Sequence, residues 1–334
     1  MTSYDGYGSV GTPVKPPCGK SVPARPASSS GGGTKALTGA MKLIRFQDIP
    51  NQPALGYDLD GLCTCPGKTA CRNKLGPDKP CDVPAGTGID NAAGAILALL
   101  YPPSAAQSLT DSLKRGQNGM VVQIQNYNGL KDDADVSVAL YNVVGVNGKS
   151  DGTGNAAFDG NDEMILDDAS LEINTTGPRF TDTSAYVAGG VLVGKLDFDL
   201  RLAIPPGTID AQAPVVAVVP LKAAYIVGKI TIVGGTGLEM EDAQLVGRIK
   251  ENDIFTQISR IGLCQDSGSF EPVKQRACTA LDLPAKPGDE AKDLVCDALS
   301  LAVGVVIAPA RLGGHAAVDN GTGLCGAESL VSCD

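Results

Sequence analysis

A pair of aspartates, Asp58 and Asp60, has the type and spacing to bind a metal ion. The pair lies in the sequence Asp-Leu-Asp-Gly, which ends at Gly61. Ca²⁺ prefers hard oxygen ligands, and a Gly permits the tight turn that gathers them. Further oxygen-bearing residues follow among the neighbouring cysteines. The candidate calcium ligands are Asp58, Asp60, Asp82, Asp90 and Asn91.

The match to a calcium-binding loop is incomplete, so a purely structural interpretation stays open. Cys63 stands where the usual loop has another acidic residue, and Thr69 stands where it has a bidentate Glu. In the structural interpretation, Asp58 or Asp60 stabilises a turn and Asp90 caps a helix.

A second acidic patch lies within residues 159–168. Two carboxylates held roughly 5–10 Å apart across a cleft can hydrolyse glycosidic bonds, so a secreted hydrolase is one hypothesis. The chain has no Trp and is only 4% aromatic, which leaves few rings to stack on a sugar. A solvated acidic loop or a weak calcium site explains the patch more simply. The acidic residues are Asp159, Asp162, Glu163, Asp167 and Asp168.

His315 is the only histidine of the chain, and any Ser-His-Asp or Cys-His site would have to use it. Since the cysteines look structural, we expect His315 on a surface loop and assign no catalytic residue.

The chain has ten cysteines, an even number that favours disulfides in an oxidising compartment. Their spacing departs from the Cys-x2–4-Cys pairs typical of zinc sites. Besides Cys18, the cysteines expected in disulfides are Cys63, Cys65, Cys71, Cys81, Cys264, Cys278, Cys296, Cys325 and Cys333.

The early four cysteines can pair in two ways, because Cys63 and Cys65 are too close in the chain to bridge each other easily. Either Cys63 pairs with Cys71 and Cys65 with Cys81, or Cys63 pairs with Cys81 and Cys65 with Cys71. The later group has five members, so one of them pairs with Cys18, stays free or bridges another chain. Cys18 with Cys333 is one such pairing.

The composition predicts a mainly β protein to carry these residues. The chain is 43% hydrophobic but poor in aromatics, with 42 Gly and 22 Pro, so β-branched residues fill the core and turns are frequent. Period-two alternation over 120–127, 135–141 and 195–202 predicts strands, and the charged residues of 195–202 predict a solvent-exposed sheet face. Several short strands favour a β-sandwich of jelly-roll or lectin-like type.

The 334 residues divide into three expected regions. Residues 1–39 form a disordered Gly/Pro/Ser-rich tail. Residues 40–116 form a Cys-rich helical portion pinned by disulfides, with helices over 90–100 and 104–115. Residues 117–334 form the sandwich, with helical insertions over 254–261 and 290–298, capped by Asp253 and Asp289, and C-terminal disulfides.

Charge and hydropathy exclude two classes of partner. A net charge of −10 without a basic block argues against nucleic acid. The longest apolar runs, 92–101 and 299–310, are shorter than the roughly 20 residues that span a bilayer. Residues 1–7 have neither a basic nor an apolar stretch typical of an export signal.

Several blocks together resemble an uncharacterised family of predicted secreted proteins and lipoproteins of myxobacterial type. The blocks are Gly56–Gly61 with Cys63 and Cys65, Cys81-Asp82, Gly88–Ala92, Asn126–Leu130 and Cys296–Ser300. They are scattered over roughly residues 40–310. The resemblance implies an extracytoplasmic address and no known activity, although its members usually carry an export signal that this chain does not display.

The sequence therefore predicts a non-enzymatic binding or structural module outside the cytoplasm, secreted or tethered to the cell surface. Disulfides stabilise it, and its ligand is an unidentified surface or extracellular molecule. The first alternative is a calcium-dependent lectin-like or adhesion domain, with calcium as the cofactor. The second is a hydrolase that uses paired carboxylates.

Overall fold

The structure is a computed structural model of the chain. It describes residues 20–28, 33–46, 54–63, 70–75, 87–94, 96–97, 101, 106–204, 215–290, 294–318, 325 and 331–333.

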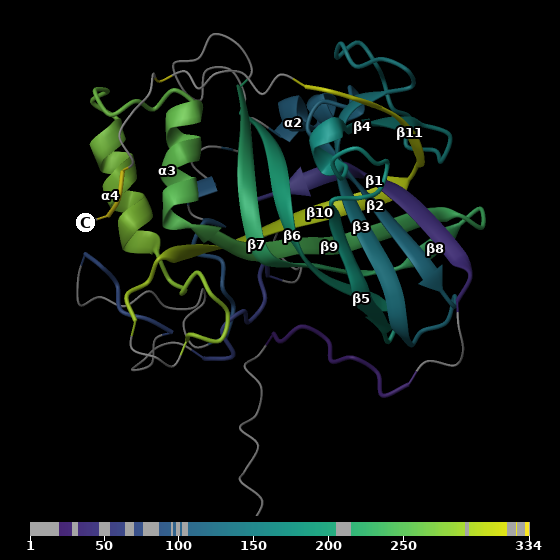
Figure 1. Ribbon diagram of the computed structural model, residues 1–334, viewed down its shortest axis with the longest axis horizontal. Coiled ribbons are helices and arrows are strands. Elements are labelled where there is room, and N and C mark those ends of the chain that lie inside the picture. Colours follow the sequence, from purple (N-terminus) through teal and green to yellow (C-terminus); the bar gives the residue numbers. More distant parts are fainter. Residues whose placement is uncertain are drawn as a thin grey trace, which may run out of the picture.

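Eight antiparallel strands close into a barrel (Figure 1). Around the barrel the order is β3, β2, β1, β10, β9, β7, β6 and β5, and β5 pairs back with β3. The strands are β1 (Lys35–Arg45), β2 (Gly119–Tyr127), β3 (Asp133–Val146), β5 (Phe180–Ala188), β6 (Val191–Ile204), β7 (Val215–Lys229), β9 (Gly237–Lys250) and β10 (Ala298–Pro309).

The prediction of a mainly β chain is confirmed, but the sheet closes on itself and does not form the two stacked sheets of a sandwich. Alternation along a strand shows that one face is buried, yet it does not show what buries that face. Here the ladder between β3 and β5, which includes Val138 opposite Asp182, removes the free edges that a sandwich would have.

Apolar side chains from alternate residues fill the barrel. On β6 the inward residues are Leu196, Phe198, Leu200 and Leu202, all buried. Phe198 meets the ring of Phe180 edge to face, with centroids 5.3 Å apart. Eight strands give an interior just wide enough for side chains to fill.

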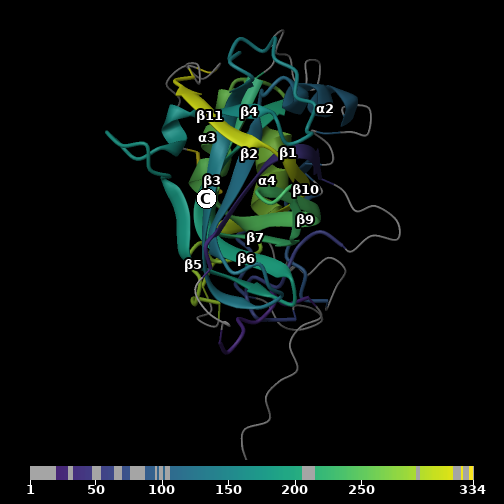
Figure 2. The same ribbon diagram turned by 90° about the vertical axis from the view of Figure 1, so that its right-hand side faces the viewer.

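A second, smaller core lies outside the barrel. Strands β4 (Glu163–Asp167) and β11 (Arg311–Ala316) extend the sheet beyond β3, and Figure 2 shows them together at one side of the barrel. They cover the outer faces of β1, β2 and β3. Residues Val138–Val146 are therefore buried on both faces or nearly so.

The outer face of β6 is only partly exposed to solvent. Lys195 and Asp197 are exposed, as predicted. Arg201 is buried and forms a 2.7 Å ion pair with buried Asp167. A charged side chain can be buried when a partner compensates its lost hydration, which the alternation alone does not reveal.

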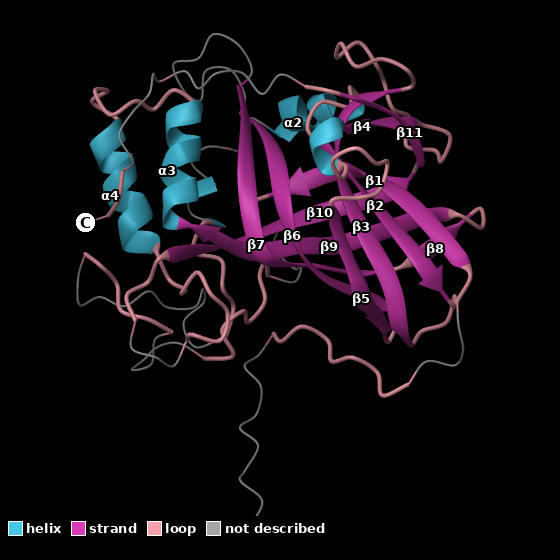
Figure 3. Cartoon of the chain, viewed as in Figure 1, coloured by secondary structure: helices cyan, strands magenta, loops and turns pink. Residues whose placement is uncertain are grey.

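The helices gather at one end of the barrel (Figure 3). They are α2 (Ala106–Lys114), α3 (Glu251–Arg260) and α4 (Phe270–Ala280). The prediction of α2 is confirmed, and Gly116 (φ 71°) follows its end. Helix α3 begins before Asp253, which lies in its first turn and is not the cap. Helix α4 was not predicted.

Two predicted segments differ from the structure. A helix over 290–298 is wrong, because Ala298 is the first residue of β10 and Val295 forms a bridge with Arg72. Strand β1 begins at Lys35 and so includes residues 35–39 of the expected tail. Residues 40–45 of β1 therefore belong to the barrel.

Between described residues, three disulfides join segments that are distant in the chain. They are Cys71–Cys296, Cys264–Cys325 and Cys278–Cys333. Both predicted alternatives for the early cysteines are wrong at Cys71, because Cys71 bridges to Cys296 across 225 residues. The predicted pairing of Cys333 with Cys18 is also wrong, because Cys333 bridges to Cys278. Cys63 is also disulfide-bonded, and Cys18, Cys65 and Cys81 lie outside the described residues.

Candidate functional site

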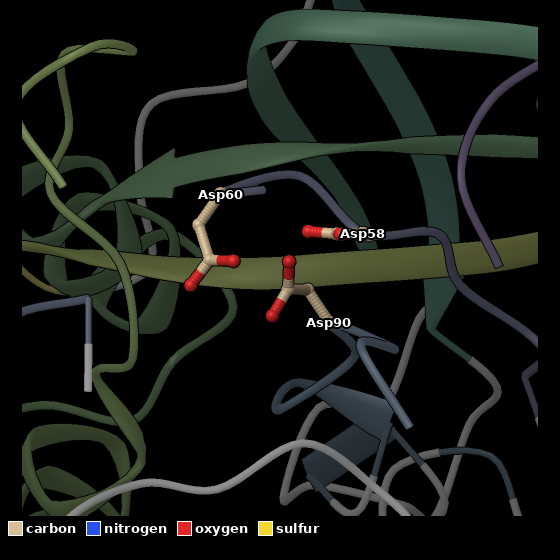
Figure 4. Close-up of side chains that lie close together, drawn as sticks. All are labelled: Asp58, Asp60 and Asp90. Carbon is tan, nitrogen blue, oxygen red and sulfur yellow. The ribbon is translucent and has the colours of Figure 1, made fainter. Parts of the chain in front are cut away.

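Three of the predicted calcium ligands lie together beside β10 (Figure 4). Asp58, Asp60 and Asp90 each offer a carboxylate oxygen, and these oxygens lie within 4.8 Å of one another. A bridge between Tyr57 and Asp90 brings the two chain segments side by side.

Backbone hydrogen bonds hold the three carboxylates in place. Asp58 Oδ1 accepts from the N–H of Gly61 at 2.6 Å, and Asp60 Oδ1 accepts from the N–H of Leu62 at 2.6 Å. These bonds confirm the predicted turn. Asp90 Oδ2 accepts from the N–H of Leu59 at 2.6 Å. Asp90 therefore ties two loops together and does not cap a helix as predicted.

The cluster is electrostatically unfavourable when every carboxyl is charged. Burial, with the nearby charges of Asp60 and Asp282, raises the pKa of Asp90 to about 9. Burial also raises the pKa of Asp282 to about 6, against hydrogen bonds from Ser300 and the nearby charge of Arg248, which lower it. A proton or a bound cation would relieve this repulsion.

The other two predicted ligands do not join this cluster in the described residues. Asn91 Oδ1 accepts from the N–H of Ala302 at 2.9 Å, which directs its side chain to β10, and Asp82 is outside the described residues. Asp58, Asp60 and Asp90 alone would give a Ca²⁺ ion fewer than the six to eight oxygens it usually takes. Backbone carbonyls or water would have to supply the others.

Carboxyl groups of the second acidic patch, within residues 159–168, make structural contacts. Asp162 is buried and accepts hydrogen bonds from backbone N–H groups of its own loop. Asp167 pairs with Arg201. Asp168 lies 2.5 Å from the Nδ1 atom of His315. The carboxyls of this patch therefore serve separate contacts.

His315 lies on β11, not on the loop that we predicted, and its partner Asp168 was not predicted. The chain also contains Gly148-Lys-Ser-Asp-Gly152, which has the form Gly-x-Ser-x-Gly and was not predicted as a site. In nucleophile elbows this sequence joins a strand to a helix. Here it lies in the connection from β3 to β4, and Ser150 is exposed.

A cavity of about 360 Å³ lies between one end of the barrel and helices α3 and α4. Figure 1 shows these two helices side by side next to the end of β7. The walls are almost entirely apolar and come from seven parts of the chain. They include Leu97, Leu202, Ala217, Ile249, Ile258, Val273 and Leu301.

Few polar side chains reach this cavity. Gln257 lines it from α3 and Arg276 from α4. Tyr101 also lines it, but its hydroxyl is buried and its ring stacks on Phe46 with centroids 4.2 Å apart. A helix over 254–261 was predicted, but helix α4 was not, so the sequence did not indicate the cavity between them and the barrel.

A closed eight-stranded barrel with helices over one end is the class of fold that these observations define. No protein-family model matches the chain, and comparisons with curated proteins and with solved structures found no similar protein. Within the described residues, no helix is long and apolar enough to cross a membrane.

Proposed function

We propose that the protein is an extracytoplasmic binding module that holds a small apolar molecule in the cavity at the end of its barrel. The cavity carries this proposal. Ligand sites are typically concave, lined by apolar side chains and roughly 300–1,000 Å³ in volume, and 360 Å³ lies at the small end of that range.

The disulfides support the same interpretation in two ways. Covalent pairs of this number are compatible with an oxidising compartment, as the proposed extracytoplasmic location requires. Cys278 lies on α4, and its bond to Cys333 fastens that helix. A fixed helix keeps the cavity open, because it cannot easily collapse onto the barrel end.

A neutral fluorescent probe tests the proposal. N-phenyl-1-naphthylamine fluoresces in apolar surroundings, and we expect saturable binding of one probe per chain. Replacing Ile258, which lines the cavity, with Trp fills part of the volume. Thr256 is exposed on the same helix, so Thr256→Trp is the matched control.

The expected result is at least a tenfold loss of probe affinity in Ile258→Trp and none in Thr256→Trp. Probe binding that is absent, or equal in both variants, would refute the proposed function. Melting temperatures of the variants show whether either one has simply lost its fold.

We also propose, as a second function, a calcium-dependent adhesion domain that binds Ca²⁺ at the aspartate cluster. Three buried or half-buried carboxylates within 4.8 Å favour it. A cation that binds only the folded chain raises its stability, by about 3 kcal/mol at a hundred times the dissociation constant.

Thermal melting with excess CaCl₂ or EDTA tests this second proposal. We expect calcium to raise the melting temperature of the native chain and to have no effect on Asp60→Asn. Asp159, an exposed aspartate outside the cluster, provides the control Asp159→Asn, which should respond like the native chain. Identical melting in CaCl₂ and EDTA would exclude a calcium site here.

A further inference from the structure

The cavity between the barrel end and helices α3 and α4 has walls that are almost entirely apolar. Among the described residues that line it, only Tyr101, Gln257 and Arg276 have a polar or charged side chain. These three side chains therefore contribute mainly carbon atoms to the walls. Their contacts show where the polar atoms lie.

The polar atoms of Gln257 and Tyr101 are directed into the protein. The Oε1 atom of Gln257 accepts a hydrogen bond from the N–H of Val218 at 3.0 Å, which ties the amide group to the backbone of β7. The ring of Tyr101 stacks on Phe46 and its hydroxyl is buried, so the hydroxyl is not on the cavity surface. Neither side chain presents a head-group site.

Arg276 lines the cavity from α4 although it is exposed to solvent. Long cationic side chains cover apolar surface with their methylene groups and keep the charged end in water. This division explains how an arginine contributes to an apolar wall. The charge of Arg276 belongs to the outer surface, and the cavity receives its carbon atoms.

We propose that the ligand is a neutral hydrocarbon without any hydrogen-bonding group, and that the cavity selects against alcohols and carboxylic acids. This inference rests on the proposed function and names the chemical class of its ligand. A hydroxyl group that enters the cavity loses its hydrogen bonds to water and gains none from these walls. That loss weakens binding roughly tenfold to a hundredfold, and the loss for a carboxylate is larger.

The same walls favour a hydrocarbon because apolar cavities stay dry and take up small apolar molecules. A cavity of roughly 150 Å³ lined by aliphatic and aromatic side chains is enough to bind benzene. The cavity here, about 360 Å³ in volume, is roughly twice as large, so a hydrocarbon with two rings fits. Naphthalene is therefore a suitable test molecule.

Displacement of bound N-phenyl-1-naphthylamine at pH 7.5 by three molecules with one ring system tests the inference. Naphthalene has no polar group, 1-naphthol adds a hydroxyl, and 1-naphthoate adds a carboxylate. We expect naphthalene to displace the probe at about one tenth of the 1-naphthol concentration or less. We expect 1-naphthoate to be the weakest of the three.

A single substitution in the wall tests the cause of this preference. Val273 lines the cavity from α4, and Val273→Thr replaces one methyl group with a hydroxyl of similar size. The preference for naphthalene over 1-naphthol should then fall roughly threefold or more, because the wall now offers a hydrogen-bonding partner. Val233 is exposed on β8 (Thr231–Val233), away from the cavity, and the control Val233→Thr should keep the native preference.

Two failures are distinguishable. If the neutral probe does not bind the native chain, the proposed function fails and this inference fails with it. If the probe binds but 1-naphthol displaces it as well as naphthalene does, only the hydrocarbon assignment is overturned. The same conclusion follows if Val273→Thr binds the probe and melts like the native chain, yet keeps the full native preference.

Discussion

Replacing Asp90 with Asn should make the stability of the protein less dependent on pH. The pKa of Asp90 is raised to about 9 in the folded chain, against about 4 when unfolded. Between these values the folded chain holds one more proton than the unfolded chain. Asp90 therefore makes its full contribution to the free energy of unfolding below pH 4, and this contribution is lost as the pH rises towards 9.

The size of the effect follows from one proton. Each pH unit changes the free energy of unfolding by about 1.4 kcal/mol per proton. A range from pH 6.5 to 8.5 avoids most of the titration of Asp282, whose pKa is about 6. Over that range the free energy of unfolding of the native chain should fall by roughly 2–3 kcal/mol because Asp90 loses its proton. The Asp90→Asn variant should not show this fall.

Urea unfolding in EDTA at several pH values measures this slope. Asn is the same size as Asp and can still accept the hydrogen bond from Leu59, so the loop contact is kept. Asp266 is exposed, and Asp266→Asn should keep the native slope. Equal slopes in the native chain and Asp90→Asn would refute the account of the buried carboxyl.

Two further substitutions test the covalent and ionic contacts that brace the fold. Replacing Cys278 and Cys333 with Ser opens a loop of 55 residues. The free energy of unfolding in urea should fall by about 3 kcal/mol, since the neighbouring disulfide already shortens the free loop. A loss near zero would contradict the stabilising role of this disulfide. Arg201→Met leaves Asp167 buried without its partner and should cost roughly 3–5 kcal/mol. The double change Arg201→Met with Asp167→Leu should recover part of that stability, and a larger loss in the double variant would show that the pair is not the source.

Local features of the fold could be predicted because the sequence carries them locally. The alternation over 195–202 predicts a strand, and these residues lie in β6. The predicted turn at Asp58 and Asp60 forms, and both side chains accept backbone hydrogen bonds in it. Barrel closure could not be predicted, since it depends on Val138 meeting Asp182 in another strand. Such a pairing leaves no trace in either strand alone.

The pairing of the disulfides and the cavity could not be predicted, for a related reason. Nothing near Cys71 in the sequence indicates that β10 brings Cys296 to within 5.1 Å between Cα atoms. The cavity needs walls from barrel strands and from two helices, and α4 was not predicted at all. The contact of Asp168 with His315 also joins segments 147 residues apart.

Strand β10 separates the two candidate sites by the alternation of its side chains. Leu299 and Leu301 face the cavity, whereas Ser300 faces the opposite side, where its N–H and hydroxyl bond to Asp282. The Ser300 Oγ atom also accepts from the N–H of Ala92, two residues after Asp90. A substitution at Ser300 should therefore disturb the carboxyl cluster and leave the cavity walls in place. A substitution at Leu301 should disturb the cavity walls and leave the carboxyl cluster in place. Calcium response and probe binding should accordingly be lost in different variants, because period-two geometry places their residues on opposite faces of one strand.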